Sequence, residues 1–81
     1  MHKEEIQVLL DRFGYSVAVK RNIGNTGRVH MIHSGKTFDR IVEYTLDEPK
    51  DLIKFVFGYA KNEDLQCFDN VPDFEVWLNT L

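Results

Sequence analysis

Hydrophobic residues recur along the chain with a period that changes several times, and each change marks a predicted element. The first period is helical: four apolar residues follow one another at i, i+3, i+4 and i+7, namely Ile6, Leu9, Leu10 and Phe13. This spacing predicts an amphipathic helix over residues 3–13. Gly14 follows directly and is placed to end the helix in the left-handed conformation, which glycine adopts at little cost.

Alternation of apolar and polar residues comes next and predicts three antiparallel strands. Residues 15–23 and 28–33 both alternate with a period of two, and the glycine-containing segment 24–27 between them suits a hairpin loop. A third strand is predicted over residues 37–46. The alternation breaks at Arg40, so a bulge is expected near this residue.

The stretch at residues 47–62 holds the densest group of apolar side chains, and we predict it as a central helix. At about 100° per residue, one arc of this helix collects Leu52, Ile53, Phe55, Val56, Phe57, Tyr59 and Ala60. The arc is roughly 200° wide, more than one contact surface needs, so the helix is expected to be covered on two sides. Asp47 is its expected N-cap, and Pro49 falls within its first turn.

Residues 63–70 are predicted as an irregular acidic link, and a last helix follows them. Its apolar residues recur at helical spacing: Phe74, Trp77, Leu78 and Leu81. The predicted order is therefore α-β-β-β-α-α. We expect one α+β domain over residues 1–81, with a three-stranded antiparallel meander packed against helices.

Composition agrees with a globular protein, because 43% of the residues are hydrophobic and 28% are charged. No apolar run reaches the length of a membrane span, so no membrane partner is expected. The single cysteine, Cys67, fits a reducing compartment. A cytoplasmic protein, either a monomer or a homodimer, is therefore the expectation.

Chemistry-bearing residues form no catalytic or metal-binding motif. His30 and His33 are three apart on a predicted strand, so they point to opposite faces and cannot share a metal ion. Acidic pairs such as Glu4 and Glu5 are sequence neighbours, which do not face one another as paired carboxylates must. No catalytic residue, metal or cofactor is predicted, and a non-enzymatic binding protein is favoured.

Charge is distributed unevenly and defines two candidate binding surfaces. Residues 1–46 hold five acids and seven bases, whereas residues 47–81 hold eight acids and three bases. The basic part gathers on the predicted hairpin at Lys20, Arg21, Arg28, His30 and Lys36. This surface could contact nucleic-acid phosphates. No aromatic residue that could stack on unpaired bases is expected there, which argues against recognition of single strands.

The acidic part gathers between the two C-terminal helices of the prediction. Its members are Glu63, Asp64, Asp69 and Asp73. Placed where one helix ends and the next begins, they would form a compact negative surface. Such a surface could enter the groove of a host protein that is lined with Lys and Arg for nucleic acid.

The apolar segment DLIKFVFGYAKNE and the acidic segment DNVPDFEVWLNTL, with the predicted element order, resemble a small phage-encoded anti-CRISPR family. Members of that family inhibit the type II-A effector nuclease by occupying its DNA-binding groove as DNA mimics. The resemblance implies a non-enzymatic protein of a phage or mobile element that binds and inhibits a host nucleic-acid-binding protein through the acidic surface.

The first five predicted elements also resemble the double-stranded-RNA-binding-like fold, which includes small ribonuclease toxins with a strand histidine. The matching segment is Gly27-Arg28-Val29-His30. This resemblance implies an RNA-binding protein, or a ribonuclease toxin, that uses the basic hairpin. A third class is a subunit that dimerises through leftover apolar surface such as Phe57.

Overall fold

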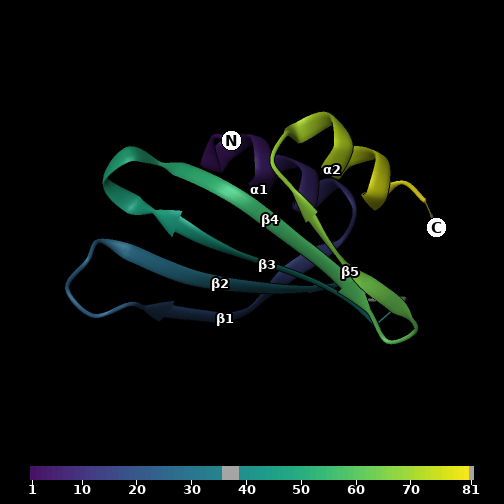
Figure 1. Cartoon of the computed structure of the whole chain (residues 1–81), viewed down its shortest axis with the longest axis horizontal. Helices are drawn as coiled ribbons and strands as arrows, with labels where there is room; N and C mark the ends of the chain where they lie inside the picture. The colour runs from purple at the N-terminus through teal and green to yellow at the C-terminus, as the bar shows by residue number, and fades with distance from the viewer. Residues whose placement is uncertain (36–38, 81) are drawn as a thin grey trace.

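The computed structural model describes residues 1–35 and 39–80 of the chain. Two helices, five strands and one short 3-10 helix follow one another in this part (Figure 1). They are α1 (Lys3–Arg12), β1 (Tyr15–Asn22), β2 (Arg28–Gly35), β3 (Arg40–Asp47), η1 (Glu48–Lys50), β4 (Leu52–Ala60), β5 (Glu63–Phe68) and α2 (Val71–Leu78).

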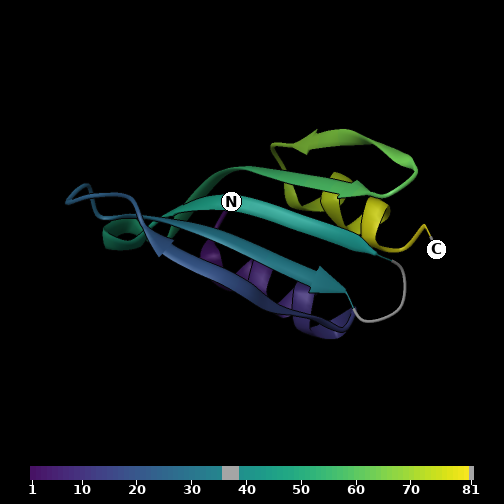
Figure 2. The same ribbon diagram turned by 90° about the horizontal axis from the view of Figure 1, so that it is seen from below.

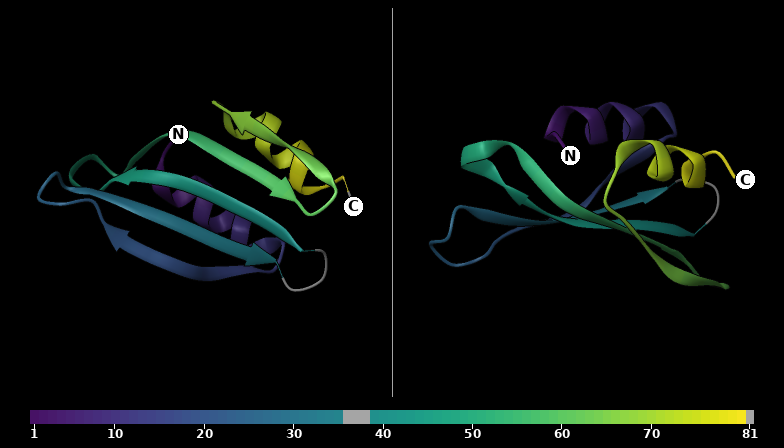
Figure 3. Two further views of the ribbon diagram at one scale, coloured as in Figure 1. Left: turned by 60° about the horizontal axis from the view of Figure 1, so that its bottom comes forward. Right: turned by 45° about the horizontal axis from the view of Figure 1, so that its top comes forward.

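The strands form one antiparallel sheet in the order β1-β2-β3-β4-β5, so each strand pairs with its neighbour in the chain. Both helices lie on the same face of this sheet (Figure 3, where the left view has the sheet in front of them). The helix α1 packs on β1 and α2 packs on β5 (Figure 2), and the two helices also contact each other. The α+β class and the antiparallel meander are confirmed, but the meander has five strands in place of the predicted three.

Local signals at the N-terminal end are confirmed. The helix α1 begins with a reciprocal cap, in which Glu4 N–H donates to His2 Nδ1 and His2 N–H donates to Glu5 Oε1. Gly14 follows the helix with a φ of +80°, the left-handed conformation expected of it. The predicted strands over 15–23 and 28–33 correspond to β1 and β2.

The predicted central helix over residues 47–62 is wrong, because this stretch forms η1 and the strand β4. The apolar residues of β4 lie on both faces of the sheet: Ile53 and Val56 are buried under the helices, and Phe57 faces the other side. The pairing register between β3 and β4 shifts between Tyr44 and Leu46, and this shift interrupts the alternation of inward and outward side chains along β4. A strand that is apolar on both faces and carries a bulge produces the wide apolar arc that suggested a helix.

The irregular link predicted over residues 63–70 is also wrong in its main part. Glu63–Phe68 is the edge strand β5, which pairs with β4 through Val56 with Phe68 and Phe57 with Cys67. The last helix is confirmed as α2, which Asn70 caps by accepting the Asp73 N–H. Leu81 of the predicted helix lies outside the described residues.

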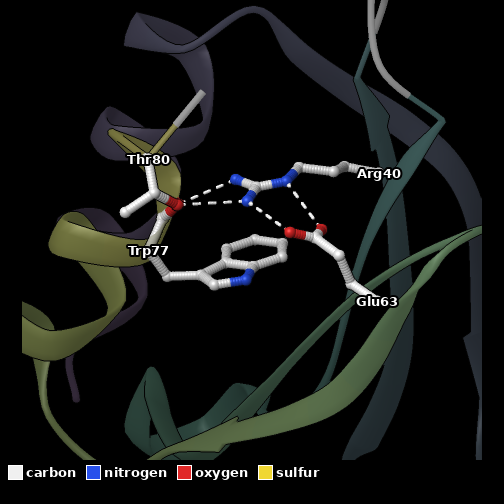
Figure 4. A network of polar contacts seen from close by, with 4 residues as sticks. All are labelled: Arg40, Glu63, Trp77 and Thr80. Carbon is white, nitrogen blue, oxygen red and sulfur yellow. Dashed lines mark hydrogen bonds and ion pairs between the residues drawn. The ribbon is translucent and has the colours of Figure 1, made fainter.

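The bulge expected at Arg40 does not occur there. Arg40 pairs in regular register with Ala60, and its side chain points under the helices, where it is 2% exposed. Arg40 Nη1 donates to the Trp77 carbonyl at 2.7 Å, and Arg40 Nε lies 3.4 Å from Glu63 Oε2 (Figure 4). The alternation of apolar and polar residues is interrupted at this position because a buried arginine occupies a core position.

The hydrophobic core fills the space between the sheet and the two helices. Its largest fully buried apolar side chains are Tyr44, Phe74, Ile6, Leu10, Ile53 and Leu78. Trp77 packs against Phe68 and Phe74 and lies directly over Gly58 of β4. This packing leaves the opposite face of the sheet outside the core.

Candidate nucleic-acid interface

The face of the sheet opposite the helices, called the open face below, carries several half-buried apolar side chains around the carboxylate of Glu43. Cross-strand partners share a face, so the pairs Ile32 with Glu43, Glu43 with Phe57, and Ile41 with Tyr59 all lie here. No described helix or strand covers them (Figure 3). This face of the sheet is therefore accessible to a binding partner.

Basic residues surround the aromatic ones at one end of the open face. An open groove of about 620 Å³ lies there, and its lining includes Phe55 and Phe57 together with Met1 and Ile53 from the helix side of the sheet. Arg28, Lys50 and Lys54 line the same groove, against one acidic residue, Asp47. Two aromatic rings therefore stand beside three cations within one groove.

The structure divides the basic hairpin cluster predicted from the sequence. Arg21 pairs with His30 across β1 and β2, and both lie on the open face, as does Arg28. Lys20 pairs with the buried Met31, so it lies on the helix side of the sheet. Lys36 lies outside the described residues.

Four residues of this groove were missed by sequence reasoning: Lys50, Lys54, Phe55 and Phe57. They were assigned to the predicted central helix over residues 47–62, not to a strand of the sheet. The expectation that aromatic residues are absent beside the basic hairpin is therefore wrong. The β-branched and aromatic composition of Ile53 to Tyr59 was the signal that favoured a strand.

A polar network lies at the centre of the open face. His30 Nε2 contacts Glu43 Oε2, and the Tyr59 hydroxyl donates to Glu43 Oε1 at 3.5 Å. A carboxylate has no proton to donate, so the hydrogen of this contact belongs to His30 Nε2. Burial, and the neighbouring Glu43 carboxylate, raise the pKa of Tyr59. The hydroxyl therefore stays protonated and acts as a donor to Glu43.

His33, the second strand histidine, has a structural role. It is buried under the helices, its Nε2 lies 2.8 Å from the Tyr44 hydroxyl, and the two rings stack. Burial lowers the pKa of His33, which favours the neutral ring. His33 therefore belongs to the core, while His30 lies on the open face, so the two point to opposite faces as expected. Within residues 1–35 and 39–80, no three potential metal ligands form a cluster.

The four acidic residues predicted as a partner surface lie at two ends of one strand. Glu63 and Asp64 begin β5, whereas Asp69 and Asp73 follow its end, roughly 16 Å of extended chain away. Glu63 pairs with Arg40, and both Asp69 and Asp73 accept hydrogen bonds from the Asn70 amide. The fold does not gather these carboxylates into one compact surface.

Comparison with models of protein families, with curated proteins and with solved structures gave no match. Neither helix of the described chain has the length and apolar character that a membrane crossing requires. Function is therefore inferred below from the chemistry of the open face.

Proposed function

We propose that this protein binds single-stranded nucleic acid on the open face of its sheet. Bases would stack on Phe55 and Phe57, and phosphates would lie near Arg28, Lys50 and Lys54. The observation that supports the proposal is the groove in which these two rings and three cations stand together. Stacking on aromatic rings with a basic track beside them is how single strands are held without dependence on sequence.

The two kinds of contact differ in what they contribute. Stacking of one base on one ring contributes about 1–3 kcal/mol and discriminates against a duplex, whose bases are already stacked. Phosphate contacts add affinity that falls with salt. Phe55 is 42% exposed, so its ring is available to a ligand without rearrangement of the core.

The overall charge of −3 does not oppose this proposal, because local fields govern the approach of a charged ligand. On the helix side, Glu4, Glu5 and Asp11 lie in α1, and Asp73 and Glu75 lie in α2. The groove on the open face has three bases and one acid in its lining. A polyanion would therefore approach the sheet from the open face.

Two other functions have less support from the geometry. Inhibition of a host protein through an acidic surface is a separate proposal, and the carboxylates it needs are divided between the two ends of β5. RNA cleavage needs an acid and a base on opposite sides of the phosphate. His30 and Glu43 are instead hydrogen-bonded to each other, so they do not stand on opposite sides of a phosphate. Binding without cleavage is therefore the function we propose.

Fluorescence anisotropy with a labelled 12-nucleotide uridine strand tests the proposal, and a duplex of equal length is the comparison. The single strand is expected to bind more tightly. If each of the three cations contacts one phosphate, the logarithm of affinity should fall with the logarithm of salt with a slope of about −2. Lys54→Ala should flatten this slope by about 0.7, whereas Lys61→Ala, in the turn between β4 and β5, should not.

Phe57→Leu tests the stacking contact, because leucine keeps an apolar side chain and removes the ring. Single-strand affinity should fall about tenfold. The matched control is Val76→Ala, at a residue of α2 that is 64% exposed and lies on the helix side. Equal binding of duplex and single strand, no binding at low salt, or a stable dimer that covers the open face would refute the proposal.

A further inference from the structure

A second, smaller groove of about 260 Å³ adjoins the first on the open face. It is lined by His30, Glu43, Tyr44, Thr45, Phe57 and Leu65, and it shares Thr45 and Phe57 with the larger groove. Pockets for drug-sized ligands usually have about 300–1,000 Å³, so this one suits a smaller planar group such as one nucleobase. A strand that follows the larger groove would place a neighbouring base here.

The polar group in this groove is the Glu43 carboxylate, which is directly across from Phe57 and 32% exposed. Each carboxylate oxygen can accept two hydrogen bonds. One site on Oε2 is taken by His30, and one site on Oε1 by the long contact from Tyr59. No other hydrogen bond to this carboxylate occurs within residues 1–35 and 39–80, so each of its two neighbouring oxygens has one acceptor site left for a ligand.

Two adjacent acceptors fit a base that presents two adjacent N–H donors. Guanine does so on its Watson–Crick edge, with its ring N1–H and its 2-amino group. Adenine and cytosine place a ring acceptor beside their amino group, which would meet the carboxylate unfavourably, and uracil offers a single ring N–H. Hydrogen bonds to an ionised acceptor are stronger than neutral ones, so the distinction between bases is large.

We infer that this smaller groove selects guanine, with Phe57 as the stacking surface and Glu43 as the specificity-determining residue. The inference rests on the proposed binding of single strands and names the base that they carry. His30 is a positioning residue: its Nε2–H holds Glu43 Oε2, so that the free acceptor sites stay directed into the groove.

Anisotropy with the uridine 12-mer and its derivatives tests this inference. Each derivative carries one central guanosine, adenosine, cytidine or inosine. The guanosine strand should bind at least about fivefold more tightly than the adenosine and cytidine strands, the lower limit for a good bidentate contact. Inosine keeps the ring N1–H and lacks the 2-amino group, so it should lose most of this advantage. These measurements use the unmodified protein and do not depend on the folding of a variant.

Glu43→Gln then assigns the residue, because an amide replaces one acceptor oxygen with a donor. The ratio of guanosine to adenosine affinity should fall to about one. Glu75→Gln, at an exposed residue of α2 on the helix side, is the matched control and should keep the ratio of the unmodified protein.

Failure of the uridine strand to bind would overturn the proposed function itself. Binding of the uridine strand with equal affinity for all derivatives would overturn only the guanine inference. Inosine that binds as tightly as guanosine would refute the two-donor contact, and a preference that survives Glu43→Gln would refute the assignment to Glu43.

Discussion

Removal of the Glu63 carboxylate is expected to destabilise the fold more than removal of the Arg40 guanidinium, although Glu63 is 48% exposed and Arg40 is 2% exposed. The guanidinium donates to the Trp77 carbonyl at 2.7 Å and to Thr80 Oγ1 at 3.1 Å. It lies 4.0 Å from the centre of the Trp77 ring. Its Nε has no hydrogen-bond partner among the described residues, so the Glu63 charge 3.4 Å away is what compensates it.

The two substitutions leave different groups behind. Glu63→Ala leaves a buried cation without its counter-charge, which typically costs about 3–5 kcal/mol. The lower end, about 3 kcal/mol, is expected because water can enter on the exposed side of Glu63. Arg40→Met loses a cation–π contact of about 1–2 kcal/mol and hydrogen bonds of about 1 kcal/mol each, but it also removes the cost of burying a charge. The remaining Glu63 is free to hydrate, so a net cost of about 1 kcal/mol is expected.

Urea unfolding of four proteins measures this difference: the unmodified chain, Glu63→Ala, Arg40→Met and the double variant. Trp77 is the only tryptophan, so its fluorescence reports directly on this cluster. The double variant should match Arg40→Met, because once the cation is gone Glu63 has nothing to compensate. An Arg40→Met variant that is less stable than Glu63→Ala, or a double variant with additive losses, would refute the reasoning.

Three further variants test the core. Gly58→Ala would place a Cβ 2.7 to 2.9 Å from three carbons of the Trp77 ring, so a loss of about 1–3 kcal/mol is expected, and an unchanged melting temperature would contradict it. Val56→Asp would bury an unpaired carboxylate at a residue that is 0% exposed, and it should unfold the domain; a cooperative melt near that of the unmodified protein would show otherwise. Burial lowers the folded pKa of His33 below 6.5, so its contribution to the free energy of unfolding is fully present above pH 6.5 and is lost as pH falls below that value. His33→Phe should flatten the pH dependence of stability between about pH 7 and 5, and an unchanged profile would exclude His33 as its source.

Elements with strong local signals could be predicted from the sequence. The helix α1 has apolar residues at helical spacing and ends next to Gly14, and the hairpin of β1 and β2 has Gly24 and Gly27 with positive φ. The strand β4 could not be assigned in this way, since its register with β3 depends on contacts distant in sequence. Without that pairing, apolar residues on two faces of a bulged strand match a helical pattern as well as a strand pattern.

Only the basic part of the candidate site could be predicted from the sequence, for the same reason. Arg21, Arg28 and His30 could be found as a basic hairpin, but Phe57 joins them only through its pairing with Glu43 across β3 and β4. The error on β4 thus hid the aromatic half of the surface and led to the opposite expectation about single strands. The role of Glu63 was hidden as well, because its partner Arg40 lies 23 residues earlier.

The most direct test of binding on the open face is an NMR titration of methyl-labelled protein with the uridine 12-mer. Leu52 and Leu65 place exposed methyl groups in the lining of the two grooves, whereas Val8 and Val76 place exposed methyl groups on the helices. Binding as proposed shifts the signals of Leu52 and Leu65 in proportion to the fraction bound and leaves those of Val8 and Val76 in place. Shifts confined to Val8 and Val76, or no shift of any methyl signal at a saturating concentration of the uridine 12-mer, would contradict binding on the open face.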